Sequence, residues 1–213
     1  KIDNFKNINL MAISVHIGSQ INNVKPFLEL ISILDKTIKK NNLKLKYVDL
    51  GGGIGVPYEK NEKKLNISKY AKQIFKFSKK HNCKIILEPG RLISANTAVL
   101  ISRITYIKNT KNKKFIILDA GMNDFMRPAL YDAKHHIFPL KNSHQRFNCP
   151  VEFVGPVCES SDKFLKVNNF IKLYENDYVC ISDVGAYGSS LSSNYNLRPF
   201  LAEILINGSK FNI

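Results

Sequence analysis

The sequence predicts an α/β unit over residues 1–94, followed by a mostly antiparallel β domain over residues 95–213. In the first part, a short apolar run, a polar loop and a helical pattern follow one another repeatedly, which is the order of a parallel sheet or barrel. After Ser94 the pattern changes to strand-like runs rich in β-branched and aromatic residues. A chain of 213 residues can bury a core in one or two such domains.

Three β-prone runs supply the strands of the first part: Leu10–Val15, Tyr47–Leu50 and Ile85–Leu87. The third is continuously apolar, so we expect it to be buried on both faces of the sheet. Each run ends in a polar or glycine-rich loop, and such loops build the active sites of β/α barrels. The loops are His16-Ile-Gly-Ser-Gln20, Gly51-Gly-Gly-Ile-Gly-Val-Pro-Tyr58 and Glu88-Pro-Gly-Arg91.

Two amphipathic helices are predicted between these strands. Their apolar residues recur three or four positions apart, so each helix has one apolar face that can pack on the sheet. These residues are Phe27, Leu28, Ile31, Leu34 and Ile38 in the first helix, and Ile67, Tyr70, Ile74 and Phe77 in the second.

The second part contains five strand-like runs and little helix. A short helix is expected around Ala129–His136. Turns rich in Gly, Pro and Asn separate the runs, as in an all-β domain. The expected strands are Thr97–Ile107, Phe115–Leu118, Val151–Val154, Tyr178–Ile181 and Phe200–Ile206.

The formal net charge of +15 raises the question of a nucleic-acid partner. Lysines such as Lys36, Lys39 and Lys40 are spread over the polar faces of the predicted helices, and no stripe of arginine alternates with aromatic residues. We therefore expect no nucleic-acid partner. No apolar run reaches membrane-spanning length, and the first residues are too polar for a signal peptide, so we expect no membrane attachment.

Cysteine and histidine usage favours a reduced, cytoplasmic protein without a metal centre. The tandem His135-His136 lacks the usual spacing of metal ligands, and no Cys/His/Asp cluster supports a metal site. No pair of cysteines has C-x-x-C spacing. The four cysteines are Cys83, Cys149, Cys158 and Cys180.

Three motifs each allow a structural and a functional interpretation. Val56 stands where a dinucleotide-binding loop needs its third glycine, and no Gly-Lys-Ser/Thr follows. The run Gly51–Gly53 is therefore either a bare turn or a loop whose unobstructed N–H groups bind a phosphate. His16 alone is either structural or functional. Cys158 beside Glu159 is either a buried, inert cysteine or a thiol in a polar, functional loop.

Six motifs, taken in order, resemble those of the diaminopimelate decarboxylases, and the resemblance runs from about Ala12 to the last residue. That family consists of pyridoxal-phosphate enzymes with an alanine-racemase-like barrel and a C-terminal β domain. The resemblance implies that the first part is the C-terminal part of a (β/α)8 barrel. The motifs are His16-Ile-Gly-Ser-Gln, Asp49-Leu-Gly-Gly-Gly, Glu88-Pro-Gly-Arg, Arg127-Pro-Ala-Leu-Tyr131, Cys158-Glu-Ser-Ser-Asp162 and Asp183-Val-Gly-Ala-Tyr187-Gly.

The resemblance implies that the chain helps to bind pyridoxal 5'-phosphate. Glu88 would pair with the protonated pyridine nitrogen and so keep the ring an electron sink, and His16 would stack on the ring face. Cys158 would be a proton donor or steering group near the reacting carbon. The implied phosphate-binding groups are Ser19, the glycines Gly51, Gly52 and Gly53, the backbone of Gly90 and Arg91, and the Tyr187 hydroxyl.

The implied reaction is the decarboxylation of meso-2,6-diaminopimelate to L-lysine and CO2. Arg91, Arg127 and Tyr131 would hold the substrate carboxylate far from the reacting carbon, with Tyr187 also beside the substrate. Glu159 would take the ammonium at that same end. Because Cys158 and Glu159 of this family reach the partner subunit's active site, the resemblance also implies a homodimer.

The sequence departs from the family pattern in three places. Val184 stands where alanine is usual and Lys134 where an aromatic residue is common, but neither has an assigned role. The Schiff-base lysine of the family, in a Lys-Ala-Asn setting on an early strand, has no counterpart here. We therefore expect a fragment that is inactive alone and that, with barrel edges unpaired, associates or aggregates.

Two other functions remain open from the sequence. One is a sister decarboxylase of ornithine or arginine, or an amino-acid racemase, on the same scaffold. The other is a non-catalytic homologue that binds a partner enzyme. The implied site for a distal carboxylate argues against a sister decarboxylase, since ornithine has no distal carboxylate. The presence of every assignable cofactor residue argues against the second.

Overall fold

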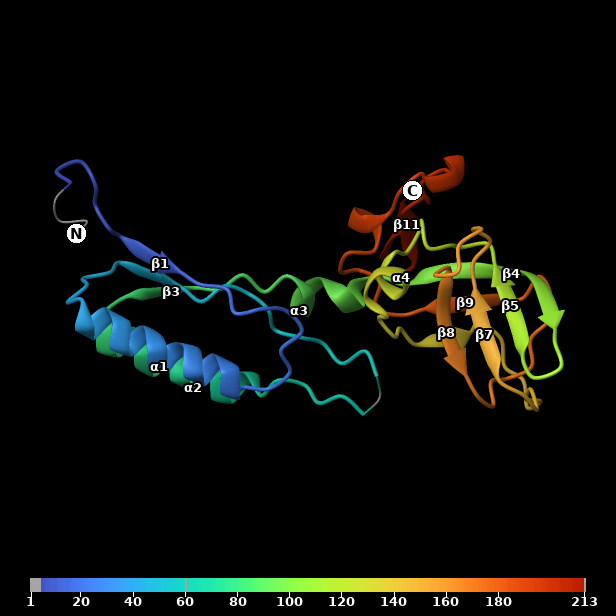
Figure 1. Cartoon of the computed structure of the whole chain (residues 1–213), viewed down its shortest axis with the longest axis horizontal. Coiled ribbons are helices and arrows are strands. Elements are labelled where there is room, and N and C mark those ends of the chain that lie inside the picture. The colour runs from blue at the N-terminus through green and yellow to red at the C-terminus, as the bar shows by residue number, and fades with distance from the viewer. Residues whose placement is uncertain (1–4, 60, 213) are drawn as a thin grey trace. The chain divides into compact units, whose positions relative to one another are not determined.

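A computed structural model of the chain describes residues 5–59 and 61–212 (Figure 1). The chain divides into two compact units, Lys1–Ser94 and Ala95–Ile213. The first contains a three-stranded parallel sheet in the order β1-β2-β3. Its elements, in chain order, are β1 (Ala12–Ser14), α1 (Lys25–Lys40), β2 (Tyr47–Asp49), α2 (Ile67–His81), β3 (Lys84–Ile86) and the short α3 (Arg91–Ser94).

Local sequence signals set the limits of the two long helices. Pro26 lies in the first turn of α1, where its missing N–H costs nothing. Asn66 caps α2 by accepting a hydrogen bond from the Lys69 backbone N–H at 2.9 Å. Asn82 ends α2 in the left-handed conformation, with a φ of 48°. Both helices end in lysines, which complement the negative end of the helix dipole.

The helices α1 and α2 lie side by side along one face of the sheet (Figure 1). The parallel register places Ile13, Val48 and Ile85 in one row, and all three pack in the same apolar cluster as the buried residues of the helices. The next row, Ser14, Asp49 and Ile86, points to the opposite face because side chains alternate along a strand.

The expectation that Ile85–Leu87 is buried on both faces is wrong for the described residues. Ile86 and Leu87 are each 42% exposed. The reason is that both helices cover the same face of the sheet, so the row with Ser14 and Asp49 has no cover among the residues that the structure describes.

The second unit is built on a six-stranded sheet in the order β6-β9-β4-β5-β7-β8. Within it only β5 and β7 run parallel, and the other neighbouring strands are antiparallel. A separate antiparallel hairpin joins β10 to β11. The elements are β4 (Leu100–Asn109), β5 (Lys114–Leu118), α4 (Arg127–Tyr131), β6 (Ile137–Pro139), β7 (Val151–Val154), β8 (Lys163–Val167), β9 (Tyr178–Ile181), β10 (Leu205–Asn207) and β11 (Lys210–Asn212).

Several expectations for this unit were inaccurate. The expected helix at Ala129–His136 is the shorter α4, which ends because Asp132 adopts the left-handed conformation at a φ of 51°. Of the expected strand Phe200–Ile206, only its last two residues are in β10. The strands β6 and β8 were not predicted, because runs of three and five residues carry little periodicity. In the described part of the chain, no helix is both long and apolar enough to span a membrane.

Asp35 joins the two helices of the first unit. Its carboxylate, on α1, lies 2.7 Å from Lys80 Nζ and 2.8 Å from His81 Nε2 of α2, and 3.1 Å from Lys39 Nζ one turn along α1. These contacts, above all the hydrogen bond from Lys80, hold the pKa of Asp35 well below its ordinary value of 3.8. A depressed pKa means that the ionised form stabilises the folded chain.

We predict that Asp35→Asn destabilises the chain at pH 6 and that the difference from wild type shrinks at pH 3. The stabilisation is present above the unfolded-state pKa of about 4 and is lost as the pH falls toward the lower folded-state pKa. Urea unfolding followed by circular dichroism measures both. Glu29→Gln, which removes an exposed pair with Lys25, is the control and should change little. Equal stability of Asp35→Asn and wild type at pH 6 would contradict the prediction.

Candidate functional site

The ends of the three parallel strands bring together the first set of predicted site residues. Two positions beyond the row of Ser14 and Asp49, the same register reaches His16, Gly51 and Glu88, here called the strand-end row. Backbone contacts continue the pairing: the Glu88 N–H donates to the Gly51 carbonyl at 2.9 Å. The three residues therefore follow the uncovered face of the sheet to its carboxyl edge.

Two glycines allow the chain to pass closely over this edge. A Cβ on Gly52 would lie 2.1 Å from the carbonyl oxygen of Glu88, and one on Gly53 would lie 2.0 Å from that of Gly18. Gly53 also has a φ of +87°, which side-chain-bearing residues rarely adopt. The Gly52 N–H donates to Nδ1 of His16 at 3.4 Å. This loop is thus shaped by contacts that only glycine permits, and its backbone can approach a ligand.

Arg91 adds a positive charge beside the glycine loop. It begins α3, and its Nη2 donates to the Ser19 hydroxyl at 3.2 Å, while Nη1 donates to the Tyr58 hydroxyl at 2.8 Å. The Arg91 guanidinium also lies 5.7 Å from the centre of the Tyr58 ring. A guanidinium, a hydroxyl and an open glycine loop together fit an anionic group such as a phosphate or a carboxylate. Sequence reasoning assigned no role to Tyr58, which lies 33 positions before Arg91.

In the second unit, Arg127 and Tyr131 lie at the two ends of α4. Arg127 is 5% exposed, and its Nη1 donates to Nε2 of His135 at 2.9 Å. His135 Nδ1 lies 2.9 Å from the Ser182 carbonyl, so it donates there and leaves Nε2 as the acceptor. Tyr131 is 64% exposed. His135 thus orients the buried guanidinium, whereas the sequence suggested no role for it.

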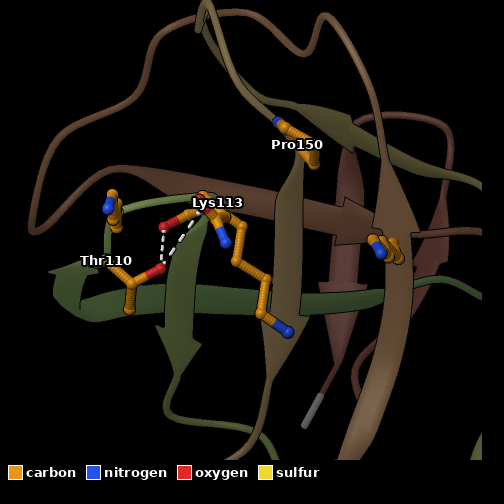
Figure 2. A pocket seen from close by; sticks show the side chains of 6 residues that line it. Thr110, Lys113 and Pro150 are labelled. Carbon is orange, nitrogen blue, oxygen red and sulfur yellow. Dashed lines mark hydrogen bonds between the residues drawn. The ribbon is translucent and has the colours of Figure 1, made fainter.

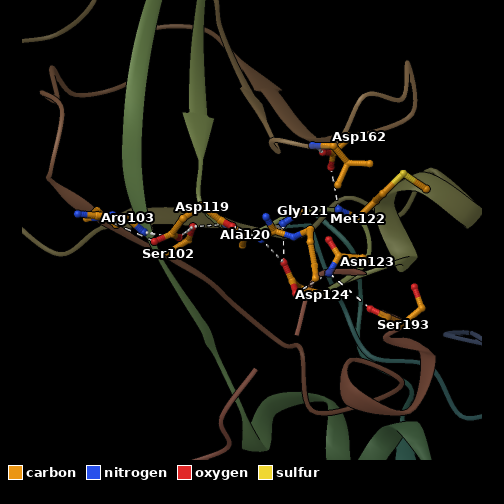
Figure 3. Close-up of polar contacts among 12 residues, drawn as sticks. Ser102, Arg103, Asp119, Ala120, Gly121, Met122, Asn123, Asp124, Asp162 and Ser193 are labelled. Carbon is orange, nitrogen blue, oxygen red and sulfur yellow. Dashed lines mark hydrogen bonds and ion pairs between the residues drawn. The ribbon is translucent and has the colours of Figure 1, made fainter. Parts of the chain in front are cut away.

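The loop with Cys158 and Glu159 is exposed but rests on a buried carboxylate. Cys158 is exposed, so the alternative of a buried, inert cysteine is wrong. Asp162, only 3% exposed, accepts the backbone N–H of Met122 and that of Val157, each at 2.7 Å (Figure 3). Burial raises the pKa of Asp162, and the two N–H donors oppose that rise. Asp162 therefore ties the loop to the segment that follows β5.

Tyr187 lies in the turn after β9 and has a φ of 62°, a left-handed conformation that is uncommon outside glycine and asparagine. Its side chain is 45% exposed. Gly188 follows, and a Cβ there would lie 2.3 Å from the Val184 carbonyl oxygen. The tight turn presents the Tyr187 ring to its surroundings, as a ligand-binding side chain requires.

A pocket at the β4–β5 turn contains none of these residues (Figure 2). It has a volume of about 330 Å³, and the Thr110 hydroxyl donates to the Lys113 carbonyl at 2.6 Å on its wall. Lys113 is paired with Glu152. This pocket therefore belongs to a charged surface turn. It is lined by Thr110, Lys111, Asn112, Lys113, Pro150 and Lys166.

A family model described as the pyridoxal-dependent decarboxylase C-terminal sheet domain matches residues 11–185. The match covers the strand-end row, the glycine loop and the Cys158 loop. The chain belongs to the pyridoxal-dependent decarboxylases.

Named members of this family resemble the chain over nearly all its length. It is 42% identical over 206 residues to diaminopimelate decarboxylase of Helicobacter pylori, covering 95% of this chain and 51% of that protein. It is 40% identical to that of Haemophilus influenzae, covering 96% of this chain and 50% of the relative. A crystal structure of the Helicobacter pylori enzyme complexed with L-lysine superposes with a TM-score of 0.85, at 42% identity over 95% of this chain and 50% of that one. The chain thus spans about half the length of these relatives.

The residues at the strand ends of this chain fit pyridoxal phosphate. The glycine loop, the Ser19 hydroxyl and the backbone of Arg91 offer hydrogen-bond donors for a phosphate. Glu88 supplies a carboxylate on the same edge, as a protonated ring nitrogen requires.

We predict that Asp162→Ala lowers the free energy of unfolding by about 3 kcal/mol, because two backbone N–H groups lose their acceptor and each such loss costs ~1–3 kcal/mol. Asp162→Asn should also destabilise the chain, because it keeps one acceptor oxygen but turns an NH2 donor toward the other backbone N–H. Urea unfolding of the chain measures both variants. A change below about 0.5 kcal/mol in Asp162→Ala, the range of ordinary surface substitutions, would rule out this anchoring role.

Proposed function

We propose that this chain supplies cofactor-binding and substrate-binding groups of a diaminopimelate decarboxylase, which converts meso-2,6-diaminopimelate to L-lysine and CO2. The proposal rests chiefly on the strand-end row and its glycine loop, present in a chain 42% identical to an enzyme of that name. The L-lysine bound in the crystal structure of that relative has the chemistry expected of the product.

We assign residues 1–94 to the C-terminal part of a (β/α)8 barrel and residues 95–213 to the C-terminal β domain. Parallel β1, β2 and β3 alternate with α1 and α2, as barrel strands alternate with outer helices. The uncovered face that carries Ser14 and Asp49 corresponds to a barrel interior. The strand-end row then lies at the carboxyl ends of the strands, where active sites of this fold are built.

Pyridoxal phosphate, when bound, supplies the electron sink that accepts the electron pair released as the bond to the leaving carboxylate breaks. Glu88 would accept a hydrogen bond from the ring nitrogen and keep that nitrogen protonated. His16, which accepts the Gly52 N–H, would stack on the ring. The phosphate would be held by Ser19, Gly51, Gly52, Gly53, the backbone of Gly90 and Arg91, and the Tyr187 hydroxyl.

At the other end of the substrate, positive and negative groups of the chain match an ammonium and a carboxylate. Arg91, Arg127 and Tyr131 hold the distal carboxylate, Glu159 takes the distal ammonium, and Tyr187 also contacts the substrate. The exposed thiol of Cys158 either donates the proton that replaces CO2 on the reacting carbon or steers the substrate beside it. His135 keeps the Arg127 guanidinium in place for this task.

We infer a homodimer in which the Cys158–Glu159 loop completes the active site of the partner subunit. The exposure of both side chains supports this, because it leaves them accessible to a partner subunit. Besides the second subunit, the proposed binding partner is a small-molecule amino-acid substrate, with neither nucleic acid nor membrane involved. The four cysteines are free, which favours a cytoplasmic location.

A sister decarboxylase or racemase is the second candidate, and a non-catalytic homologue is the third. The proposed carboxylate-binding groups Arg91, Arg127 and Tyr131 speak against ornithine or arginine as substrate, because neither has a distal carboxylate. A non-catalytic homologue would keep the fold but lose cofactor residues, whereas every cofactor residue assigned in this chain is present.

We predict that Glu88→Ala lowers turnover by about 10²–10³. The measurement uses a protein in which this chain is joined to the half of the relatives that it does not span, here called the completed enzyme. The loss of the carboxylate removes the group that keeps the ring nitrogen protonated. The cofactor should remain bound, since the phosphate contacts persist. Glu29→Ala, on the exposed side of α1, is the control and should retain turnover. Turnover of Glu88→Ala within a few-fold of wild type would refute its role.

The proposed substrate is tested in the same completed enzyme by comparing meso-diaminopimelate with lysine and ornithine. We expect the diaminopimelate rate to exceed the others by ~10⁴, because only it satisfies the groups at the distal end. Arg127→Ala should reduce this ratio mainly by slowing the true substrate. Arg146→Ala, on an exposed turn of the second unit, is the control. Comparable rates on ornithine and diaminopimelate would move the enzyme to the sister class.

A further inference from the structure

Tyr195 contacts one of the proposed substrate-binding residues but has no role in the site so far described. Its hydroxyl donates to Oε1 of Glu159 at 2.6 Å. Tyr195 belongs to the 3-10 turn η4 (Tyr195–Leu197) and lies 36 positions after Glu159. The sequence carried no signal for this contact, because nothing in the run from Ser192 to Arg198 resembles a site motif.

The segment that carries Tyr195 is anchored on both sides. Before it, the Ser193 N–H donates to the Asn123 carbonyl at 2.8 Å, and the Asn123 side-chain amide donates to the Ser193 carbonyl at 3.5 Å (Figure 3). After it, Arg198 Nη2 donates to the Asp119 carbonyl at 2.5 Å and lies 3.3 Å from Asp124 Oδ2. Asn123 and Asp124 are 0% and 7% exposed. Tyr195 therefore stands on a segment fixed to buried polar groups.

The Glu159 loop is anchored to the same buried segment. Asp162 accepts the Met122 N–H, one position before Asn123. Within the loop, the Glu159 N–H donates to the Val157 carbonyl at 2.8 Å, and the Asp162 N–H donates to the Glu159 carbonyl at 3.1 Å. The Tyr195 segment and the Glu159 loop are therefore both bonded to the same buried segment, and this sets the separation of the Tyr195 hydroxyl and the Glu159 carboxylate.

The turn is held in an unfavourable conformation. Asn196 and Leu197 have φ values of 55° and 57°, and Leu197, with a side chain 92% exposed, gains no burial in return. The left-handed conformation is unfavourable for leucine, so the flanking contacts must maintain it. The result is a turn that directs Tyr195 back to Glu159.

We propose that Tyr195 is a positioning residue that fixes the Glu159 carboxylate for the distal ammonium of the substrate, an inference that rests on the proposed function. The hydroxyl occupies one carboxylate oxygen and leaves the other for the cation. Glutamate loses side-chain freedom when it binds a ligand, and a side chain ordered beforehand loses less. The contact also raises the pKa of Tyr195, chiefly through the hydrogen bond to Glu159, so the phenol remains a donor.

The test compares Tyr195→Phe with wild type in the completed enzyme, on meso-diaminopimelate and on 2-aminopimelate, which lacks the distal amino group. We expect the KM for meso-diaminopimelate to rise about tenfold, the size typical of losing one hydrogen bond, with kcat within about twofold. Kinetics on 2-aminopimelate should not change. Glu159→Gln should raise this KM further, because it removes the charge itself, and adding Tyr195→Phe to Glu159→Gln should change little more. Tyr106→Phe, an exposed hydroxyl on β4, is the matched control.

An unchanged KM in Tyr195→Phe, or an equal loss on both substrates, would overturn the positioning role. A second readout uses the completed enzyme without substrate, because the chain alone is expected to associate or aggregate. The titration of the Tyr195 phenol is obtained as the difference between the ultraviolet titrations of wild type and Tyr195→Phe. When the same difference is measured in the Glu159→Gln background, its midpoint should move to lower pH. An unmoved titration would overturn the contact. A wild-type enzyme inactive on meso-diaminopimelate would overturn the proposed function and the ammonium-binding role with it, while the titration would still report whether Tyr195 holds Glu159.

Discussion

The parallel register of β1, β2 and β3 is the constraint on which the first unit depends. Alternation along each strand sends Ile13, Val48 and Ile85 to the helices and sends the polar row of Ser14 and Asp49 the other way. The same alternation continues beyond the strand ends, and this alone places His16, Gly51 and Glu88 in one row. Because the helices bury their apolar stripes on one face only, the other is left for chemistry.

In the second unit, a short buried polar segment has the comparable role. Gly121 to Asp124 follows β5, and its backbone and side chains receive Asp162 from one side and Ser193 and Arg198 from the other. Buried polar groups are costly unless they are paired, so a segment that satisfies several partners at once restricts all of them. The exposed Cys158 and Glu159 thus stand on a well-defined support.

Each of the two units offers both positive and negative groups to the proposed chemistry. The first offers a phosphate site and a carboxylate for a cationic ring, whereas the second offers a buried guanidinium and an exposed carboxylate for an amino-acid end. This mixture of charges explains why the overall charge of +15 is a poor guide to function. Most lysines lie on solvent faces, and the groups that match the proposed ligands are few and individually oriented.

The sequence by itself determined the strand–loop–helix order, the division into an α/β and a β part, the glycine loop and the family. These depend on periodicity and on residues adjacent in the chain, which a sequence displays directly. Only the tertiary structure decided that Ile86 is exposed, that β8 pairs with β7, that Tyr58 and Ser19 meet Arg91, and that Tyr195 meets Glu159. Those contacts join residues as many as 72 positions apart, and they depend on register and on which face the helices cover. No local pattern encodes them, because each is the product of how several elements pack together.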